Sequence, residues 1–239
     1  MRAPGFITGL ILATVTATAL ANLSAEADLA PFLAHYRAEW KSISVGTSDL
    51  DLRRDGEAGP GRYIYTWRIS AHGIFRLVYS HDVIQTSWFT ATHGHIRPDK
   101  YRAEDGSSSV EVHFDWPHGR ARGQAQSKPL DLKLEDGTQD VMSIQAEVML
   151  GLRNGTLPKT FLIIDKDQPK EFLYTQEGSE KIATALGKID TQVVTSQRAG
   201  GDRILRMWFA PSLGYVPVQA ERTRNGKLEF AMRIMTLNR

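Results

Sequence analysis

Two histidines separated by one residue, His93 and His95, have a spacing that could bind a metal ion. Alternate residues of a β-strand point to the same face, so this spacing would present two imidazoles together. A third ligand would have to come from elsewhere, and Asp99 and His81 are the candidates. The alternative is a polar strand end beside Gly94. Since the seven histidines are scattered along the chain, we expect no metal site.

Paired carboxylates could hydrolyse a glycan, because glycoside hydrolases place two such groups on either side of the scissile bond. Glu111 and Asp115 are candidates, since both alternate with apolar residues in one extended segment. They would lie on the polar face of that strand, which is normally in water. Nothing in the sequence brings two carboxylates together in a dry cleft.

Nucleophilic and phosphate-binding chemistry have weaker support. The G-x-S-x-G motif of serine hydrolases is absent, and for Ser143 we expect a capping or packing role. The glycine-rich segment at 56–61 leads into an extended run rather than a helix, so it lacks the usual phosphate-binding geometry. We therefore assign no catalytic residue, no cofactor and no metal.

Aromatic and methionine side chains form the remaining candidate site. They are Tyr63, Tyr65, Trp67, Trp208, Phe209, Phe230 and Met232. If the sheet curves on itself, one face lines an interior that can hold an apolar ligand. The alternative is an ordinary core packed against a helix, and periodicity does not distinguish the two. The candidate ligand-binding residues are Tyr63, Tyr65, Trp67, Phe230 and Met232.

The elements that must position these side chains are mainly strands. Apolar and polar residues alternate with period two through 63–69, 110–116 and 228–234, as in an antiparallel sheet with one wet face. Glycine-containing turns separate about a dozen such runs. Asn225-Gly226 should join 215–223 and 228–237 into a terminal hairpin. No βαβ alternation is present, so we expect little parallel pairing.

One segment has helical spacing. Apolar residues recur at intervals of three and four from residue 140 to 152, and Asp140 is placed to cap the first turn. Gly155 is well placed just past the end. We predict a mainly β fold: a large curved antiparallel sheet or open barrel with one packed α-helix at about 140–153.

The N-terminal segment predicts export. A basic start is followed by an apolar stretch at 6–15 and by small-residue cleavage patterns at 19–21 and 25–27. We therefore predict a signal peptide at 1–27 and a single β-rich domain at 28–239. The alternative for the first segment is an uncleaved membrane anchor. After cleavage we expect a soluble periplasmic or secreted protein with no further transmembrane span.

Composition excludes several classes of function. The chain has no cysteine, so disulfides, thiolate catalysis and iron–sulfur clusters are excluded. Basic and acidic residues number 29 and 27, for a net charge of +2, and they are interspersed. Nucleic-acid binding requires a basic surface of the kind that this pattern does not provide, so we expect no nucleic-acid partner.

Several short segments, taken in order, resemble a known bacterial family. They are Phe32–Trp40, Phe114-Asp115-Trp116 with Gly119, Asp140-Val141-Met142-Ser143, Ala185–Thr191, Leu205–Pro211 and Leu213–Val218. Together they resemble the family known as domain of unknown function 3108. The resemblance implies a β-rich protein exported from Gram-negative cells, with no established catalytic residues. The stretch 208–217 is also similar to strand-turn-strand segments of envelope proteins that carry lipid on a curved sheet.

The leading hypothesis is a periplasmic, non-enzymatic envelope protein that binds a lipid, another apolar or amphipathic ligand, or an envelope protein through the aromatic face. One alternative is a hydrolase of polysaccharide or cell wall. Another is a scaffold that recruits a partner strand at a sheet edge.

Overall fold

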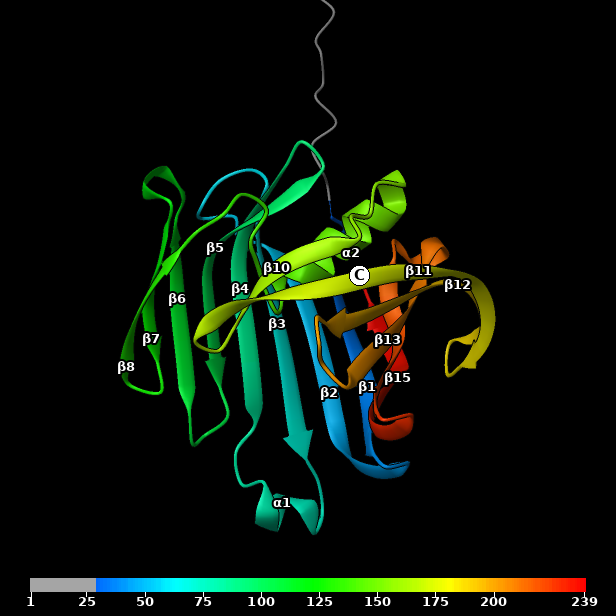
Figure 1. Cartoon of the computed structure of the whole chain (residues 1–239). Helices are drawn as coiled ribbons and strands as arrows, with labels where there is room; N and C mark the ends of the chain where they lie inside the picture. Colours follow the sequence, from blue (N-terminus) through cyan, green and yellow to red (C-terminus); the bar gives the residue numbers. More distant parts are fainter. Residues whose placement is uncertain (1–28) are drawn as a thin grey trace, which may run out of the picture.

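The computed structural model describes residues 29–239, so the predicted signal peptide lies outside the described residues. One sheet dominates this part of the chain (Figure 1). Its strands are β1 (Phe32–Trp40), β2 (Ile43–Arg54), β3 (Arg62–Ala71), β4 (Val83–Thr92), β5 (His95–Glu104), β6 (Ser109–Asp115), β7 (Arg120–Ala125), β8 (Lys128–Lys133), β9 (Gln139–Asp140), β10 (Thr160–Asp165), β11 (Gln168–Thr184), β12 (Gly187–Arg198), β13 (Arg203–Ala210), β14 (Val216–Arg224) and β15 (Lys227–Asn238). The α-helices are α1 (Phe75–Val78) and α2 (Ser143–Asn154).

The strands follow the order β8-β7-β6-β5-β4-β3-β2-β1-β15-β14-β13-β12-β11-β10-β9. All neighbouring pairs are antiparallel except β9 and β10, which are parallel. The sheet remains open, because β8 and β9 at its two ends do not pair with each other. The prediction of a mainly β fold with a large open sheet and one long helix is confirmed. The sheet has fifteen strands, compared with the dozen or so that we expected.

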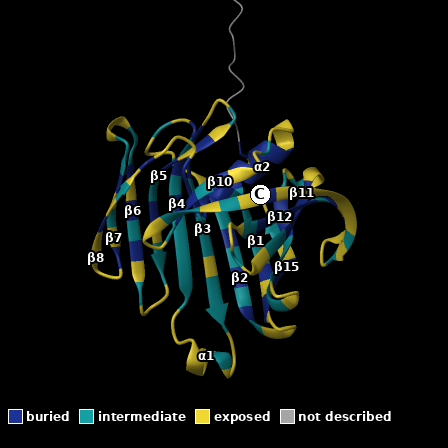
Figure 2. Cartoon of the chain, in the orientation of Figure 1, coloured by how far each residue is buried: buried dark blue, intermediate teal, exposed yellow. Residues whose placement is uncertain are grey.

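The sheet curls around α2, which lies inside the curve and contacts β4, β5 and β9 (Figure 1). Nine of the helix residues are buried, among them Ile144, Val148 and Leu152. The helix is largely dark blue in Figure 2, and its buried residues belong to one core cluster with buried residues of the strands. Full burial of each aliphatic side chain contributes about 1.5–3 kcal/mol. The helix thus covers part of the concave face of the sheet and leaves the rest of that face uncovered.

The helix begins three residues later than predicted. Asp140 belongs to β9, which pairs with β10, and its Oδ1 accepts hydrogen bonds from the backbone nitrogens of Met142 and Ser143, each at 2.8 Å. The expected capping by Asp140 is therefore present. Gly155 adopts φ +68° immediately after the helix, a left-handed conformation that glycine accepts without steric cost.

The terminal hairpin is also confirmed. β14 pairs with β15 through a turn at Asn225 and Gly226, whose φ values are +50° and +73°. Two positive φ values in succession are the signature of the tight turn that Asn-Gly favours. This hairpin supplies one wall of the interior described next.

Candidate functional site

A cavity of about 370 Å³ occupies the part of the concave face that α2 does not cover. Its wall comes from β1 to β6, β13 to β15, the start of α2 and the β10–β11 turn. The apolar lining is formed mainly by Tyr36, Leu50, Trp67, Met207, Phe230 and Met232. Asp105 and Lys166 in the same wall are exposed, so the cavity reaches solvent at that side.

A second cavity of about 350 Å³ adjoins the first between α2 and strands β10 to β14. The two share six lining residues, which include Val141 just before α2, Gln145 in its first turn and Met207 on β13. Arg222 on β14 is also common to both. The interior therefore offers two neighbouring compartments on one concave face.

Three of the five predicted ligand-binding residues line the first cavity: Trp67, Phe230 and Met232. Tyr63 and Tyr65 lie on the same face of β3 but are 1 % and 0 % exposed, and neither lines this cavity. The Tyr63 ring stacks on Phe89, with ring centroids 5.7 Å apart. The Tyr65 ring packs edge-on against that of Phe32 at 5.9 Å. These two tyrosines contribute to the packed core.

The orientation of Trp67 is fixed by a short chain of polar contacts. Its Nε1 donates to Ser48 Oγ at 2.6 Å, and that hydroxyl lies 3.7 Å from Met232 Sδ. Ser48 is buried, so this bond satisfies the indole nitrogen without water. The apolar part of the Trp67 ring can then face the cavity.

Tyr36 is fixed in a similar way on β1. Its hydroxyl donates to the carbonyl oxygen of Pro217 at 2.6 Å, and burial raises its pKa well above the usual value. A tyrosine held neutral and committed to a backbone acceptor offers its ring rather than a charge. The cavity wall is thus apolar where these rings lie.

Arg222 supplies a positive charge at the junction of the two cavities. Its guanidinium carbon lies 5.9 Å from the centroid of the Phe230 ring. Its Nε is buried and lies 3.4 Å from Glu229 Oε2, an ion-pair distance without hydrogen-bond geometry. Burial, with the nearby Arg203 adding repulsion, lowers the pKa of Arg222 despite the attraction of Glu229. A partly desolvated cation beside an aromatic wall can bind the polar end of an amphipathic molecule.

Our sequence interpretation missed Arg222. The available signal was its position on β14, two residues after Ala220, because both residues line the first cavity. A charged residue in the apolar register of a strand lies on the same face as the apolar residues around it.

Asp105 also lies in the cavity wall, but its carboxylate is committed to its own turn. It accepts hydrogen bonds from the backbone nitrogens and hydroxyls of Ser107 and Ser108. These bonds lower its pKa to about 2, so it stays ionised at neutral pH. Its role is to shape the β5–β6 turn.

The histidine pair does not share a strand face. His93 lies in the β4–β5 turn with φ +52°, and His95 begins β5, where its Nδ1 lies 3.1 Å from Glu147 Oε1. Asp99 instead pairs with Arg62 at 3.3 Å. Within residues 29–239, His, Asp and Glu form no group of three or more that could hold a metal ion. Because His93 and Gly94 lie in the turn and His95 is the first residue of β5, the pair corresponds to the alternative of a polar strand end beside Gly94.

The carboxylates Glu111 and Asp115 take part in surface ion pairs. Glu111 lies 2.9 Å from His113 and 3.3 Å from Lys100, and Asp115 lies 2.7 Å from His118. Neither lines the two interior cavities. Ser143, as expected, serves the helix start: its Oγ accepts a hydrogen bond from the Asp140 backbone nitrogen at 2.9 Å.

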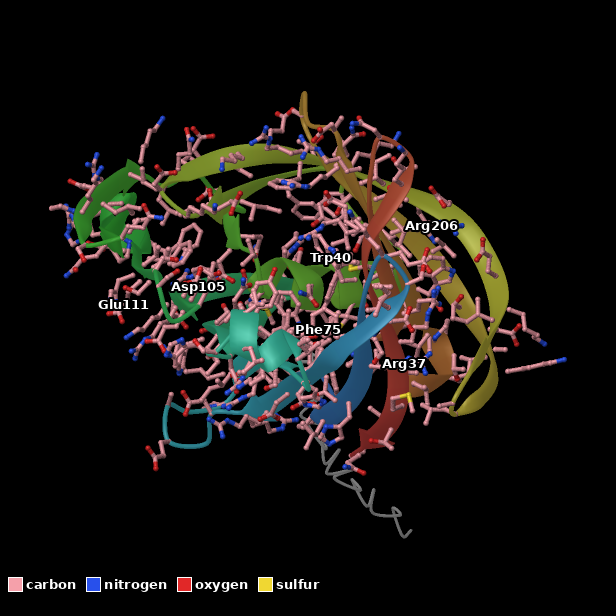
Figure 3. The ribbon with its side chains drawn as sticks, turned by 90° about the horizontal axis from the view of Figure 1, so that it is seen from below. Arg37, Trp40, Phe75, Asp105, Glu111 and Arg206 are labelled. Atoms are coloured by element: carbon pink, nitrogen blue, oxygen red, sulfur yellow. The ribbon has the colours of Figure 1, made fainter. Side chains whose placement is uncertain are left out.

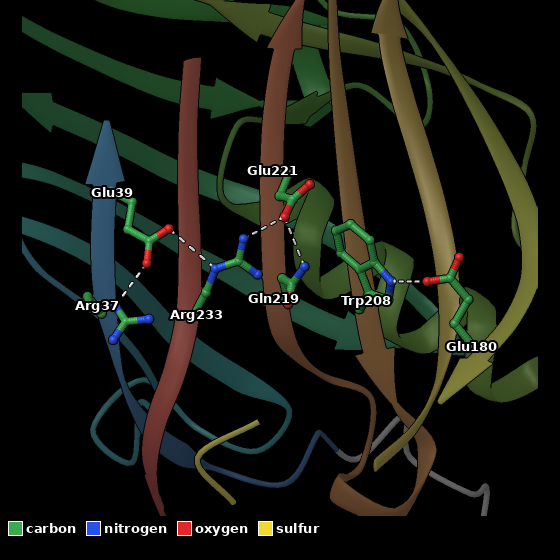
Figure 4. Close-up of polar contacts among 7 residues, drawn as sticks. All are labelled: Arg37, Glu39, Glu180, Trp208, Gln219, Glu221 and Arg233. Atoms are coloured by element: carbon green, nitrogen blue, oxygen red, sulfur yellow. Dashed lines mark hydrogen bonds and ion pairs between the residues drawn. The ribbon is translucent and has the colours of Figure 1, made fainter. Parts of the chain in front are cut away.

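The outer face of the same sheet is polar. Arg37, Glu39, Arg233, Glu221 and Gln219 form a chain of contacts across β1, β15 and β14 (Figure 4). Trp208 points to this outer side, where its Nε1 donates to Glu180 at 2.6 Å. The aromatic residues named from the sequence therefore divide between the two faces. Those facing inward form the candidate site.

The sheet edges carry charge. β8 includes Lys128, Pro129, Asp131 and Lys133, and charged residues and proline both oppose addition of another strand. β9 at the other end has only two residues. Neither of these two end strands offers the long uncharged edge that a strand-adding scaffold would require.

Comparisons with known proteins place the chain in a family. The matching family model, described as a protein of unknown function (DUF3108), aligns with residues 35–233. No curated protein is similar enough in sequence to match.

Three solved structures show a distant likeness. A protein from Bacteroides fragilis, assigned as exported and with a YmcC-like fold, has 8% identity, covers 87% of this chain and 95% of that one, and has a TM-score of 0.40. The complex of MucA and MucB from Pseudomonas aeruginosa has 12% identity, covers 90% of this chain and 54% of that one, and scores 0.37. A protein from Parabacteroides distasonis, assigned as a lipoprotein, has 7% identity, covers 87% and 95%, and scores 0.33. Scores this low establish neither fold nor function, whereas the family model spans most of the sequence, and the chain therefore belongs to the DUF3108 family of proteins of unknown function.

Proposed function

We propose that this protein is an exported, non-enzymatic component of the periplasm that binds a lipid or another amphipathic envelope molecule in the concave interior of its sheet. The observation that carries the proposal is the apolar cavity of about 370 Å³ lined by Trp67, Phe230 and Met232. Its volume lies within the range of about 300–1,000 Å³ typical of small-molecule sites. The N-terminal segment supports export.

A packing defect is a poor explanation of this cavity. Protein interiors are close-packed, and voids larger than a water molecule are few. This cavity is a recess that opens to solvent rather than an enclosed void, and its wall includes well-anchored side chains such as Tyr36 and Trp67. A wall held in place by specific hydrogen bonds can keep its shape for a ligand.

The polar groups suggest where the ends of a ligand would lie. Apolar groups would contact Trp67, Phe230 and Met232, and a polar head would lie near Arg222, between the two cavities. Arg222 keeps its aromatic neighbour on one side and Glu229 on the other. This arrangement favours an amphipathic molecule over a purely apolar one.

None of the helices among the described residues is long and apolar enough to cross a bilayer.

Filling the cavity tests the proposal. Ala220→Phe places a ring among the lining side chains and should reduce the affinity for a dansyl-labelled fatty acid by about tenfold or more. Its free energy of unfolding should stay within about 1–3 kcal/mol of the unmodified protein. The matched control is Ala58→Phe, which adds the same ring at an exposed loop position. Binding is measured by fluorescence titration and stability by urea unfolding.

The natural ligand is sought by native mass spectrometry of the protein purified from its own cell envelope, followed by lipid analysis of the denatured sample. A lipid released on unfolding, together with loss of probe binding in Ala220→Phe only, supports the proposal. Failure of the unmodified protein to bind the probe or to carry any lipid would overturn it. Equal probe binding by Ala220→Phe would do the same.

A further inference from the structure

The loop between β3 and β4 carries four large apolar side chains into solvent. Ile74, Leu77, Val78 and Tyr79 are 73 %, 84 %, 74 % and 63 % exposed. They belong to α1 or flank it, and none of the α1 residues is buried. Exposed apolar residues are normally scattered, whereas four within six consecutive residues form a local patch. We call this segment, 74–79, the apolar tip.

A second loop adds to the patch at the same end of the molecule. The β1–β2 turn carries Trp40 and Ile43, which are 43 % and 59 % exposed. The backbone nitrogen of His72 donates to Val45 at 2.9 Å, which joins the base of the apolar tip to the start of β2. Figure 1 shows both loops at the lower end of the sheet. In the view from below, Phe75 of α1 and Trp40 mark this end (Figure 3).

The stem of the apolar tip is held by ion pairs, so its exposure is a feature of the folded loop. Asp82 lies 2.6 Å from Arg76 and 3.6 Å from Arg68. The hydrogen bond from Arg76 is the main cause of the lowered pKa of Asp82. On the other side, a Cβ added at Gly106 would lie 2.4 Å from the His81 ring, so the β5–β6 turn packs closely against the loop.

The apolar tip lies beside the opening of the cavity. Val83 and Gln85, which follow the loop on β4, line the first cavity. Asp105 in the neighbouring β5–β6 turn is an exposed part of the same wall. The tip and the cavity are therefore parts of one end of the molecule.

We propose that this end docks on the surface of a lipid bilayer, with the side chains of the apolar tip entering the interfacial region. A protruding loop of aliphatic residues with Tyr79 and Trp40 at its margin matches the side-chain types that concentrate at membrane interfaces. Lys41 in the β1–β2 turn and Lys227 at the start of β15 are exposed, and the backbone nitrogen of Lys41 donates to Glu229 near the same strand start. Cations near a membrane are attracted to anionic lipid headgroups. A partner protein would be better matched by a flat or grooved surface.

Docking would bring the cavity opening against the membrane. An amphipathic ligand could then pass between bilayer and cavity with little exposure of its apolar part to water. Only this last step rests on the proposed function. Attachment of the apolar tip to lipid is a separate property and is measured separately.

The absence of cysteine permits a site-specific test. The Leu77→Cys variant is expressed as the full chain and purified in the form that the cells produce. It is then labelled with an environment-sensitive nitrobenzoxadiazole dye. On addition of vesicles of phosphatidylethanolamine and phosphatidylglycerol, the emission should shift to the blue and increase several-fold. The matched control is Leu186→Cys, at an exposed leucine in the β11–β12 turn, where the emission should stay unchanged.

A charge-insertion pair supplies the second measurement. Leu77→Glu combined with Val78→Glu should lower the fraction that floats with the vesicles by about tenfold or more, and Leu186→Glu should not. All three positions are exposed, so circular dichroism should show unchanged folding. Binding of the dansyl-labelled fatty acid without vesicles is measured for the same variants.

The outcomes separate the two proposals. Loss of flotation with retained fatty-acid binding supports membrane docking by the apolar tip. Vesicle binding that is equal in the double variant, or a dye at Leu77→Cys that does not respond, overturns docking and leaves the proposed ligand site standing. A tip that enters vesicles in a protein that binds no fatty acid supports docking and overturns the ligand site.

Discussion

Asp140 is a fully buried carboxylate at the start of α2, where several hydrogen-bond donors need an acceptor. It accepts bonds from the backbone nitrogens of Met142 and Ser143 and from Ser87 Oγ, the last at 2.7 Å. These bonds favour the ionised form, but burial dominates and raises its pKa from 3.8 to about 6. One residue therefore both fixes the start of α2 and makes the stability of the fold depend on pH.

The sign of this dependence follows from the raised pKa. Protonated Asp140 is favoured in the folded state, so its contribution is fully present below pH 3.8 and is lost as the pH rises through about 6. Asp140→Asn keeps an acceptor but cannot ionise. From pH 4 to pH 7 the stability of the unmodified protein should fall, relative to that of Asp140→Asn, by about 2 kcal/mol. Urea unfolding of both proteins across this range measures it, and parallel curves would contradict the prediction.

At the scale of elements, α2 is the part that divides the concave face. Gln145 in its first turn and Val141 just before it line the cavity, while its later residues are buried among strands. Glu147 fastens the helix to β5, since its Oε2 accepts a hydrogen bond from the backbone nitrogen of Ile96 at 2.6 Å. The position of this helix decides how much of the interior stays available.

Glu147→Ala should lower the free energy of unfolding by about 2 kcal/mol, because it leaves the buried Ile96 nitrogen without an acceptor. His95→Ala removes the other partner of Glu147, but that side chain is 72% exposed, so it should cost less than about 1 kcal/mol. Thermal unfolding of the two variants compares them. Equal stabilities would show that the Glu147 contact does not anchor α2.

At the scale of the whole molecule, the strands of the open sheet differ in how much of their length is hydrogen-bonded to neighbours on both sides. β1 is paired on both sides, with β2 and β15. β11 is paired with β10 only from Gln168 to Leu173, whereas β12 covers it as far as Thr184. The outer half of β11 therefore exposes backbone groups on one edge.

Hydrogen–deuterium exchange should follow this difference. Alternate amides of residues 175–184 should exchange on the order of 1,000-fold faster than those in the middle of β1, because they lack a partner strand. Peptide-resolved or NMR-detected exchange of the intact protein measures both regions together. Equal protection would mean that another surface covers the free edge of β11.

The local features were predictable because the signals act between near neighbours. Alternation identified β3 and β15, Asn225-Gly226 identified the tight turn between β14 and β15, and Gly155 identified the end of α2. The parallel pairing of β9 with β10 was missed. Because Asp140 belongs to β9, the helix begins later than predicted. The pairing involves residues about twenty positions away along the chain, so no local sequence pattern predicts it.

The sequence by itself determined which side chains share a face. Tyr63, Tyr65 and Trp67 alternate along one strand, and that alternation follows from backbone geometry alone. Only the tertiary structure decided that Tyr63 and Tyr65 are packed in the core while Trp67 lines a cavity. The physical reason is that strand periodicity specifies a side of the sheet, whereas the contents of that side depend on where the sheet curls and where α2 lies.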